Sequence, residues 1–379
     1  MSSSTSTFKY ITLAIFVLSL ALLAPTLKFY YTALEIAGPQ WGISTFNREN
    51  CELLKENTGA CEDISFHQAL GIAFMSCDDP KERFKWFPPL AKVDNTGKAT
   101  GRIFLFDLKT EKFIKLNFKN FDMEGLHSHG SSVWQDPSDP NSKIVLAFIN
   151  HRKTGSVIEI FEYEVGSTSV LHVETIKNDI LTSPNNLVLV GPRSFYATND
   201  LKNPRGIKRD LEIYLRYKNG YVVFYDGETS KFKVVAKDLI YANGIETNYN
   251  QDKVYVAEAT GSFLTVFERK QNNNLRKIES LAMPMNADNI FVSHLTGDIY
   301  VTGLSADPFS NKISGKTVKI TNSTSNDKFL GRQYSKEIVF ADDGKLISSP
   351  TITVVDVERK ISLISGLFNF NVVLCRKAL

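Results

Sequence analysis

A short stretch, Asn243-Gly244-Ile245-Glu246, followed by the strand-like run Lys253-Val254-Tyr255-Val256-Ala257, is the best indicator of the fold. The same arrangement returns as Asp288-Asn289-Ile290-Phe291-Val292 and Asp298-Ile299-Tyr300-Val301-Thr302. In both copies a polar or small pair precedes one β-rich run, and a turn separates that run from a second one. A supersecondary unit that recurs along a chain is typical of a repeat architecture.

Four more units have the same pattern: Leu70-Gly71-Ile72-Ala73-Phe74, His129-Gly130-Ser131-Ser132-Val133, Asn185-Asn186-Leu187-Val188-Leu189 and Ser348-Ser349-Pro350. Successive units begin 59, 56, 58, 45 and 60 residues apart. Other β-rich runs fill the intervals, among them Arg102–Leu108, Ile144–Ile149, Ser156–Tyr163 and Tyr221–Tyr225. Periods of this size, with about four strands each, indicate propeller blades. The sequence therefore predicts an all-β chain that forms a six-bladed β-propeller.

The residues that open the units should meet in space, because the first strand of each propeller blade lines the central channel. These openers are mostly carboxylates and amides: Glu62 just upstream of the first unit, His129, Asn185, Asn243, Asp288 and Asn289. Such oxygen donors suit calcium, whereas zinc or copper would call for more imidazole or thiolate. Asparagine and aspartate also initiate turns, which is the alternative explanation for each one singly. Their recurrence in three successive units favours a metal site.

The charge pattern argues against one class of partner. The 379 residues include 44 basic and 41 acidic side chains, a formal net charge of +3, without a long run of either sign. Nucleic-acid binding calls for a clustered basic surface, and this pattern does not provide one. We expect a neutral or small-molecule partner.

The first 31 residues differ from the rest of the chain. The apolar run Tyr10–Ala24 has the length of a signal-peptide core and is slightly short for a membrane span. Because the small-residue cleavage pattern is poorly formed, we expect residues 1–31 to be an uncleaved N-terminal anchor helix and residues 32–379 to be the propeller. The main body would then lie in the secretory lumen or outside the cell. The sequon at Asn322 fits glycosylation in that compartment.

Two aromatic clusters lie near this anchor, Phe29–Tyr31 and Lys85–Leu90. Together they offer an apolar face through which the protein would contact a membrane or a lipid surface. The alternative is that Trp86 and Phe87 pack beneath an ordinary loop.

The four cysteines fit the same oxidising compartment. Cys51 and Cys375 bracket nearly the whole globular body, so a bond between them would fasten the two ends of a closed ring. Cys61 and Cys77 lie close together in the sequence. Four cysteines allow three pairings, and the residues alone leave the choice open.

Three of the six histidines fall between His127 and His151. His129 opens a unit and His151 ends an apolar run, so neighbouring strands could bring both imidazoles to one point for acid–base chemistry near neutral pH. A histidine beside a strand is more often a hydrogen-bonded structural residue. The repeat places His129 at the channel, whereas we expect His127 to be a loop residue without a catalytic role.

Taken together, these motifs resemble the paraoxonase/arylesterase family over about residues 51–375. They are Cys51 followed by Glu62-Asp63, His129-Gly130, Asn150-His151, Asn185 leading into Leu187-Val188-Leu189-Val190-Gly191-Pro192, Phe195–Asp200, Ala242–Ile245 and Asp288-Asn289. The resemblance implies a calcium-dependent six-bladed propeller that hydrolyses lactones and aryl esters. The N-terminal hydrophobic segment is similar to the retained signal sequence of that family.

The resemblance also implies roles for single residues. The catalytic calcium would be held by five of them: Glu62, Asn185, Asn243, Asp288 and Asn289. His129 and His151 are similar to a histidine pair, in which His129 would deprotonate the attacking water and His151 would orient His129 or relay its proton. Cys51 and Cys375 are similar to the disulfide that closes the ring.

A second, structural calcium site is implied for Asp63, the backbone carbonyl of Ser131 and the side chain of Asn186. The family usually has an aspartate where this chain has Asn186, so the second ion would lack a carboxylate and bind more weakly. Cys61 and Cys77 are additions to the family pattern, and no role carries over to them.

Other functions stay open at this point. A propeller that only binds a partner would not need several oxygen donors and a histidine to meet, so their separation in space would favour it. Enzymes of the strictosidine synthase or gluconolactonase type are a further alternative, which the histidine pair and the terminal cysteines fit less well. A serine nucleophile is disfavoured, because the chain has no Gly-x-Ser-x-Gly elbow.

Overall fold

The computed structural model describes residue 19 and residues 45–86, 100–122, 125–139, 141–305, 313–322, 333–377 and 379. The predicted anchor helix over residues 1–31 lies outside this part, except for Ser19. Within the described residues, no helix has the length and apolar character needed to cross a membrane. Asn322 is exposed at the end of a strand, and the other two residues of its sequon lie outside the described ranges.

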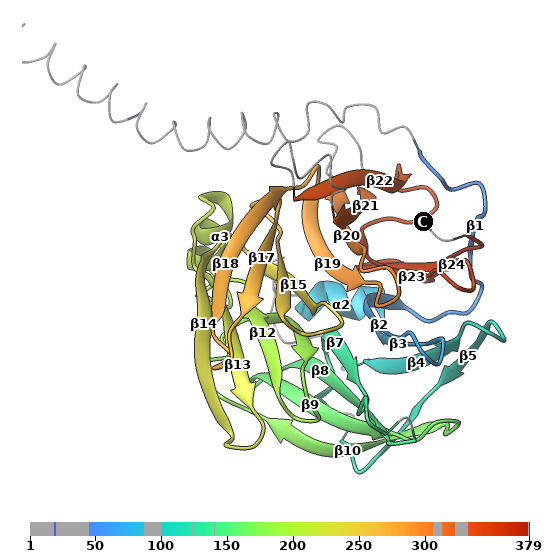
Figure 1. The fold of residues 1–379 in the computed structure, drawn as a ribbon, viewed down its shortest axis with the longest axis horizontal. Coiled ribbons are helices and arrows are strands. Elements are labelled where there is room, and N and C mark those ends of the chain that lie inside the picture. The colour runs from blue at the N-terminus through green and yellow to red at the C-terminus, as the bar shows by residue number, and fades with distance from the viewer. Residues whose placement is uncertain are drawn as a thin grey trace, which may run out of the picture.

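Six sheets surround a common centre as the blades of a propeller (Figure 1). Blade 1 contains β2 (Ala60–His67), β3 (Ile72–Asp78), β4 (Arg102–Asp107) and β5 (Lys112–Lys115). Blade 2 contains β7 (Ser128–Trp134), β8 (Ile144–Arg152), β9 (Gly155–Tyr163) and β10 (Ser169–Ile176), with β6 (Asn117–Lys119) parallel to β10. Blade 3 contains β11 (Pro184–Leu189), β12 (Phe195–Asn199), β13 (Gly220–Asp226) and β14 (Lys231–Leu239).

The remaining blades continue in chain order. Blade 4 contains β15 (Ala242–Thr247), β16 (Lys253–Glu258), β17 (Phe263–Arg269) and β18 (Leu275–Ala282). Blade 5 contains β19 (Asn286–Val292), β20 (Ile299–Ser305), β21 (Ser314–Asn322) and β22 (Tyr334–Asp342). Blade 6 contains β23 (Pro350–Asp356), β24 (Ile361–Gly366), β25 (Val373–Cys375) and β1 (Cys51–Leu53). The predicted all-β, six-bladed propeller is confirmed.

Blade 6 is built from both ends of the globular body. β1 pairs antiparallel with β25, and the register sets Cys51 opposite Cys375. A disulfide joins these two residues across 324 positions of sequence, and a second one joins Cys61 to Cys77 between β2 and β3. Of the three possible pairings, the structure thus selects the one that fastens the ring.

The hydrophobic core lies between neighbouring blades. Ile149 and Ile160 of blade 2 pack with Leu187 and Phe195 of blade 3 in one buried cluster. Since each blade is covered on both faces, its central strands are continuous apolar runs, and β8 is buried from Ile144 to Asn150.

One repeat unit was predicted one strand too late. Gly71 lies between β2 and β3 with a φ of 67°, a left-handed conformation that glycine adopts without strain. The run after it, Ile72–Asp78, is therefore the second strand of blade 1. β2 is the strand that lines the channel, so Glu62 is the opener of this blade.

All six inner strands have a register shift at the same level of the channel. In β7, β11, β15 and β19, three residue steps of the inner strand face two steps of its partner, which is the geometry of a β-bulge. β2 and β23 have shifts at the corresponding place. A bulge changes the direction of side chains, whereas a regular strand would send consecutive residues to opposite faces. This is how two adjacent residues, Asp288 and Asn289, both become available to one site.

Glycines let neighbouring inner strands approach each other beside these bulges. A Cβ atom on Gly130 would lie 2.5 Å from the backbone oxygen of Asn185, and one on Gly244 would lie 2.5 Å from that of Asp288. Any side chain here would push two blades apart. The glycines therefore set the closeness of the residues at this end of the channel.

Two short helices interrupt the strands among the described residues, α2 (Pro80–Trp86) and α3 (Ile207–Tyr214). α2 lies across the middle of the ring in Figure 1. Its buried Arg83 donates from Nη2 to the backbone oxygen of Ser128 at 2.9 Å, which holds the helix against the start of β7.

Candidate active site

Five buried side chains lie where the inner strands bulge: Glu62, Asn185, Asn243, Asp288 and Asn289. Nδ2 of Asn289 donates to Oε1 of Glu62 at 2.8 Å, which connects blade 5 to blade 1 across the channel. Asn243 donates a side-chain hydrogen bond to the carboxylate of Asp288, which connects blades 4 and 5. The structure thus brings Glu62 to Asn289 and Asn243 to Asp288, residues that the sequence only aligned by repeat position.

Three oxygens in this set are buried without any hydrogen-bond donor: Oε2 of Glu62, Oδ1 of Asn185 and Oδ1 of Asn243. A buried oxygen without a partner costs about 1–3 kcal/mol, so three of them at the bulges of the inner strands call for a compensating ligand. A hard cation that accepts carboxylate and amide oxygens satisfies that requirement. Within the described residues, His, Cys, Asp and Glu side chains alone do not form a metal-binding group of three, so the amides are essential members of this set.

The electrostatics of the two acids support the same fit. Burial, followed by the nearby charges of Asp63 and Asp288, raises the pKa of Glu62 well above its usual range. Burial and then Asp63 raise the pKa of Asp288 to about 8. Both shifts have the same cause, since carboxylates are crowded in a place with little water. A cation among them would restore their ionised forms.

The two predicted histidines form a direct pair beside the acids. Nδ1 of His129 lies 3.0 Å from Nε2 of His151, and Nδ1 of His151 lies 2.8 Å from Oγ of Ser156. On the other side, Nε2 of His129 lies 3.8 Å from Oε1 of Glu62. Burial, with nearby positive charge, lowers the pKa of His129 well below its usual value and that of His151 to about 3. Both rings are therefore neutral at physiological pH.

Helix α2 adds residues that sequence reasoning did not assign to the site. Trp86 packs against His127 and His151 with ring centroids 4.8 and 5.8 Å away. Trp86 is only 2% exposed, so it packs in the interior and does not contribute to an apolar outer face. Phe87–Leu90 lie outside the described residues. The positively charged Arg83 lowers the pKa of Glu62, opposing the effect of burial.

His127 lies in the loop before β7, as expected, but it is buried. Its backbone N–H donates to Oδ1 of Asn150 at 2.9 Å, and Nδ2 of Asn150 donates to Oε1 of Glu159 at 2.8 Å. These bonds tie the loop to blade 2 next to His151. In the Asn150-His151 motif, Asn150 therefore holds the loop in place beside His151.

The residues predicted for a second ion are arranged differently. The carboxylate of Asp63 accepts hydrogen bonds from the backbone N–H of Ile64 at 2.9 Å and of Ser131 at 2.8 Å. The Oδ1 atom of Asn186 accepts from the N–H of Leu187 at 2.6 Å, and its Nδ2 donates to Asn289 at 2.7 Å. These side-chain oxygens are thus already satisfied by the protein. The argument from partnerless oxygens therefore rests on Glu62, Asn185 and Asn243; the oxygens of Asp63 and Asn186, like that of Asn289, already accept hydrogen bonds from the protein.

The fold and these residues define a six-bladed propeller with an oxygen-rich, histidine-flanked channel end. A sequence model of the arylesterase family matches residues 43–376. Serum paraoxonase/arylesterase 2 of Gallus gallus is 31% identical over 316 residues, which cover 81% of this chain and 83% of that protein. Serum paraoxonase/lactonase 3 of Oryctolagus cuniculus is 33% identical over 254 residues, 66% of this chain and 68% of the relative. The chain belongs to the arylesterase (paraoxonase) family.

A solved structure, a luciferin-regenerating enzyme, shares the fold. It is 11% identical in sequence, with a TM-score of 0.51, and the similarity covers 86% of this chain and 94% of that one. The family membership predicted from the motifs is confirmed, and this likeness at low sequence identity shows the fold alone.

Proposed function

We propose that this paraoxonase-like hydrolase cleaves lactones and aryl esters at the channel end where Glu62, His129 and Asp288 meet, with calcium as its metal. The observation that carries the proposal is the cluster of partnerless buried oxygens next to a pair of neutral histidines. Membership of the arylesterase family supports the reaction class. Its relatives are named as an arylesterase and as a lactonase, which correspond to the two substrate types.

The residues that would hold calcium are Glu62, Asn185, Asn243, Asp288 and Asn289. When bound there, the ion polarises a carbonyl group and stabilises the oxyanion that ester hydrolysis produces. The carboxylates neutralise its charge, and the bulges together with Gly130 and Gly244 keep the donors at fixed positions. Such preorganisation matters, because a donor that must move during the reaction stabilises the transition state less.

The histidine pair supplies the proton acceptor in this proposal. If His151 donates from Nδ1 to Ser156, its Nε2 accepts the proton on Nδ1 of His129. In that tautomer the lone pair of His129 is on Nε2, the ring atom closest to Glu62. A water molecule on this side would then lose its proton to His129, while His151 fixes the orientation of the ring.

A propeller that only binds a partner is less compatible with this arrangement. For such a binding protein we expected the residues that open the repeat units to lie far apart. Asn289 and Glu62 are instead within hydrogen-bond distance. The two disulfides fit a protein that matures in the secretory pathway or outside the cell. We further propose that residues 1–31 anchor it at a membrane or lipid surface.

The test uses the purified full-length chain with phenyl acetate as an aryl ester and δ-valerolactone as a lactone. We expect hydrolysis of both in calcium, loss of both activities after chelation, and recovery on adding calcium back. Unchanged rates in the chelator would refute the metal-dependent mechanism. Activity on neither substrate in calcium would refute the proposed substrate class.

A further inference from the structure

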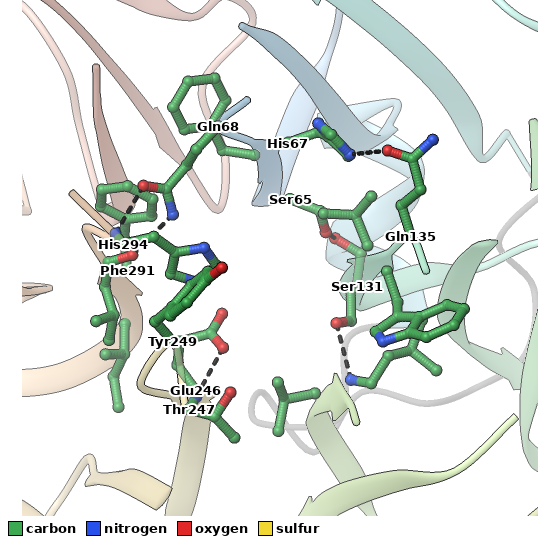
Figure 2. A pocket seen from close by; sticks show the side chains of 18 of the residues that line it. Ser65, His67, Gln68, Ser131, Gln135, Glu246, Thr247, Tyr249, Phe291 and His294 are labelled. Atoms are coloured by element: carbon green, nitrogen blue, oxygen red, sulfur yellow. Dashed lines mark hydrogen bonds between the residues drawn. The ribbon is translucent and has the colours of Figure 1, made fainter. Parts of the chain in front are cut away.

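A cavity of about 370 Å³ is lined by Asp63, Ser131 and Asn186, and Figure 2 shows Ser131 on its wall. Its walls continue along the inner strands to His67, Tyr249 and His294, at the ends opposite to those that carry the bulges. His129, His151 and Asp288 do not line it. The volume lies in the range of small-molecule sites. It is therefore a second possible binding place, separate from the candidate active site.

The lining carries negative charge without a basic partner. It includes the carboxyl groups of Asp63, Asp136 and Glu246 and contains no lysine or arginine. Its two histidines, His67 and His294, are half-buried or exposed residues whose pKa values are lowered, chiefly by desolvation. They are neutral at pH 7 and above, so they do not offset the acids once Glu246 ionises above its raised pKa of about 8. The cavity thus favours a positively charged occupant.

Most polar groups on the walls already have partners in the protein. Nε2 of His67 pairs with Oε1 of Gln135 at 2.9 Å, and Gln68 bonds to the backbone of Val292 and of His294. The carboxylate of Asp63 accepts the bonds described above. These groups form part of the walls, and their hydrogen bonds are already made within the protein.

Glu246 is the exception. Its carboxylate accepts a bond from the N–H of its neighbour Thr247 at 2.7 Å, the one hydrogen bond that the described residues give it. Figure 2 shows Glu246 on the wall across the cavity from His67 and Gln135. A carboxylate can accept about four hydrogen bonds, so most of its capacity remains for a donor in the cavity.

The rest of the wall is apolar and aromatic. Phe66 and Phe291 pack with ring centroids 5.9 Å apart, and Tyr249 packs against His294 at 5.4 Å with 69% of its surface exposed. A bare metal ion would need six or more oxygens close together, and within the described residues Glu246 belongs to no group of three His, Cys, Asp or Glu side chains that could hold one. An organic cation would use both the acid and the apolar surface.

We propose that this cavity binds a small organic ammonium ion, whose nitrogen pairs with Glu246 and whose apolar body packs against Phe66 and Phe291. The site shares neither the histidine pair nor the five residues proposed to hold the catalytic calcium, although Asp63, Ser131 and Asn186, the residues implied for a second ion, lie in its wall.

The test compares two probes that differ in one group, 4-phenylbutylammonium and 4-phenylbutan-1-ol, by calorimetry on the full-length chain in calcium. Measurements at pH 8.5 keep Glu246 ionised, since its pKa is raised to about 8 by burial and then by Asp63. We expect the ammonium to bind at least about 10-fold more tightly than the alcohol, because charge pairing is lost in the neutral probe. Equal affinities for the two probes would overturn the proposal.

Two variants localise the effect. Glu246→Gln keeps an acceptor for the Thr247 amide and should abolish the preference for the ammonium, whereas Asp136→Asn removes a rim charge already bonded to Ser138 and should retain it. A preference that survives Glu246→Gln, or falls equally in both variants, would contradict the assignment. Melting curves establish that each variant is folded. Competitive inhibition of phenyl acetate hydrolysis by the ammonium would place it at the active site instead and would likewise overturn the proposal.

Discussion

Nδ2 of Asn289 donates a hydrogen bond to Oε1 of Glu62 across 2.8 Å, although 227 residues separate the two along the chain. This bond orients Glu62 so that Oε2 remains without a donor. The contact joins blade 5 to blade 1 and leaves one carboxylate oxygen of Glu62 for a ligand. Contacts between blades thus decide which oxygens of the site are hydrogen-bonded within the protein and which remain for a ligand.

The first prediction concerns the acids of this set. Glu62→Gln and Asp288→Asn preserve shape but remove charge from the proposed calcium site, so each should lower ester and lactone hydrolysis by at least about 10²-fold. Each should also reduce the rise in melting temperature that calcium gives the wild type, a readout independent of activity. Asp136→Asn, at the other end of the channel, should change neither. An unaltered calcium-dependent melting shift in Glu62→Gln would exclude Glu62 as a ligand.

The second prediction separates the histidines. His129→Gln removes the proposed proton acceptor and should lower kcat by about 10²-fold or more, whereas His151→Gln, which acts through His129, should have a smaller effect. His294→Gln is the matched control, because His294 is neither a proposed calcium ligand nor a member of the histidine pair. Equal kcat values for His129→Gln and wild type would mean that water is activated without this ring. Calcium-dependent stabilisation should persist in all three variants, because none replaces a proposed ligand.

The third prediction concerns ring closure. Replacing both Cys51 and Cys375 by alanine frees a loop of 324 residues and should lower the free energy of unfolding by about 5 kcal/mol. The same change at Cys61 and Cys77 opens a loop of 16 residues and should cost about 3 kcal/mol. Denaturant titrations of the two double variants measure the difference. A larger loss for the short loop would show that local packing of β2 and β3 outweighs the chain entropy.

The fourth prediction concerns His127, a buried histidine to which the proposed reaction assigns no step. Burial, followed by Arg83 and Lys153, lowers the pKa of His127 to about 4, while its unfolded-state value is near 6.5. Between these values the unfolded chain binds the extra proton, so the stabilising contribution is complete above pH 6.5 and is lost as the pH falls toward 4. The slope for this group is up to about 1.4 kcal/mol per pH unit.

His127→Gln removes that titration. The free energy of unfolding of the variant should therefore rise relative to that of the wild type as the pH is lowered from 7 to 4.5. Denaturant titration at each pH measures this difference. A constant difference across this range would show that His127 titrates equally in the folded and unfolded chains.

Much of the fold and of the candidate site could be predicted from residue patterns. The spacing of the polar pairs gave six blades, and the openers Asn185, Asn243 and Asp288 lie where the repeat predicts. The first unit was misplaced, because the turn glycine Gly71 imitates the pair that opens a blade. Arg83 and Trp86 were not assigned to the site, since a seven-residue helix between two strands has no periodicity that points to the channel.

The sequence by itself determined the type of fold, the family and the kinds of side chain available at the channel end, because these depend on local periodicity and residue chemistry. The Cys51–Cys375 disulfide that the family resemblance implied is confirmed, whereas only the tertiary structure decided that Cys61 pairs with Cys77 and which oxygens are left without partners. It also placed bulges in all six inner strands at one level, so that the adjacent Asp288 and Asn289 both serve the site. Such features depend on contacts between blades more than 50 residues apart, and no local pattern encodes them.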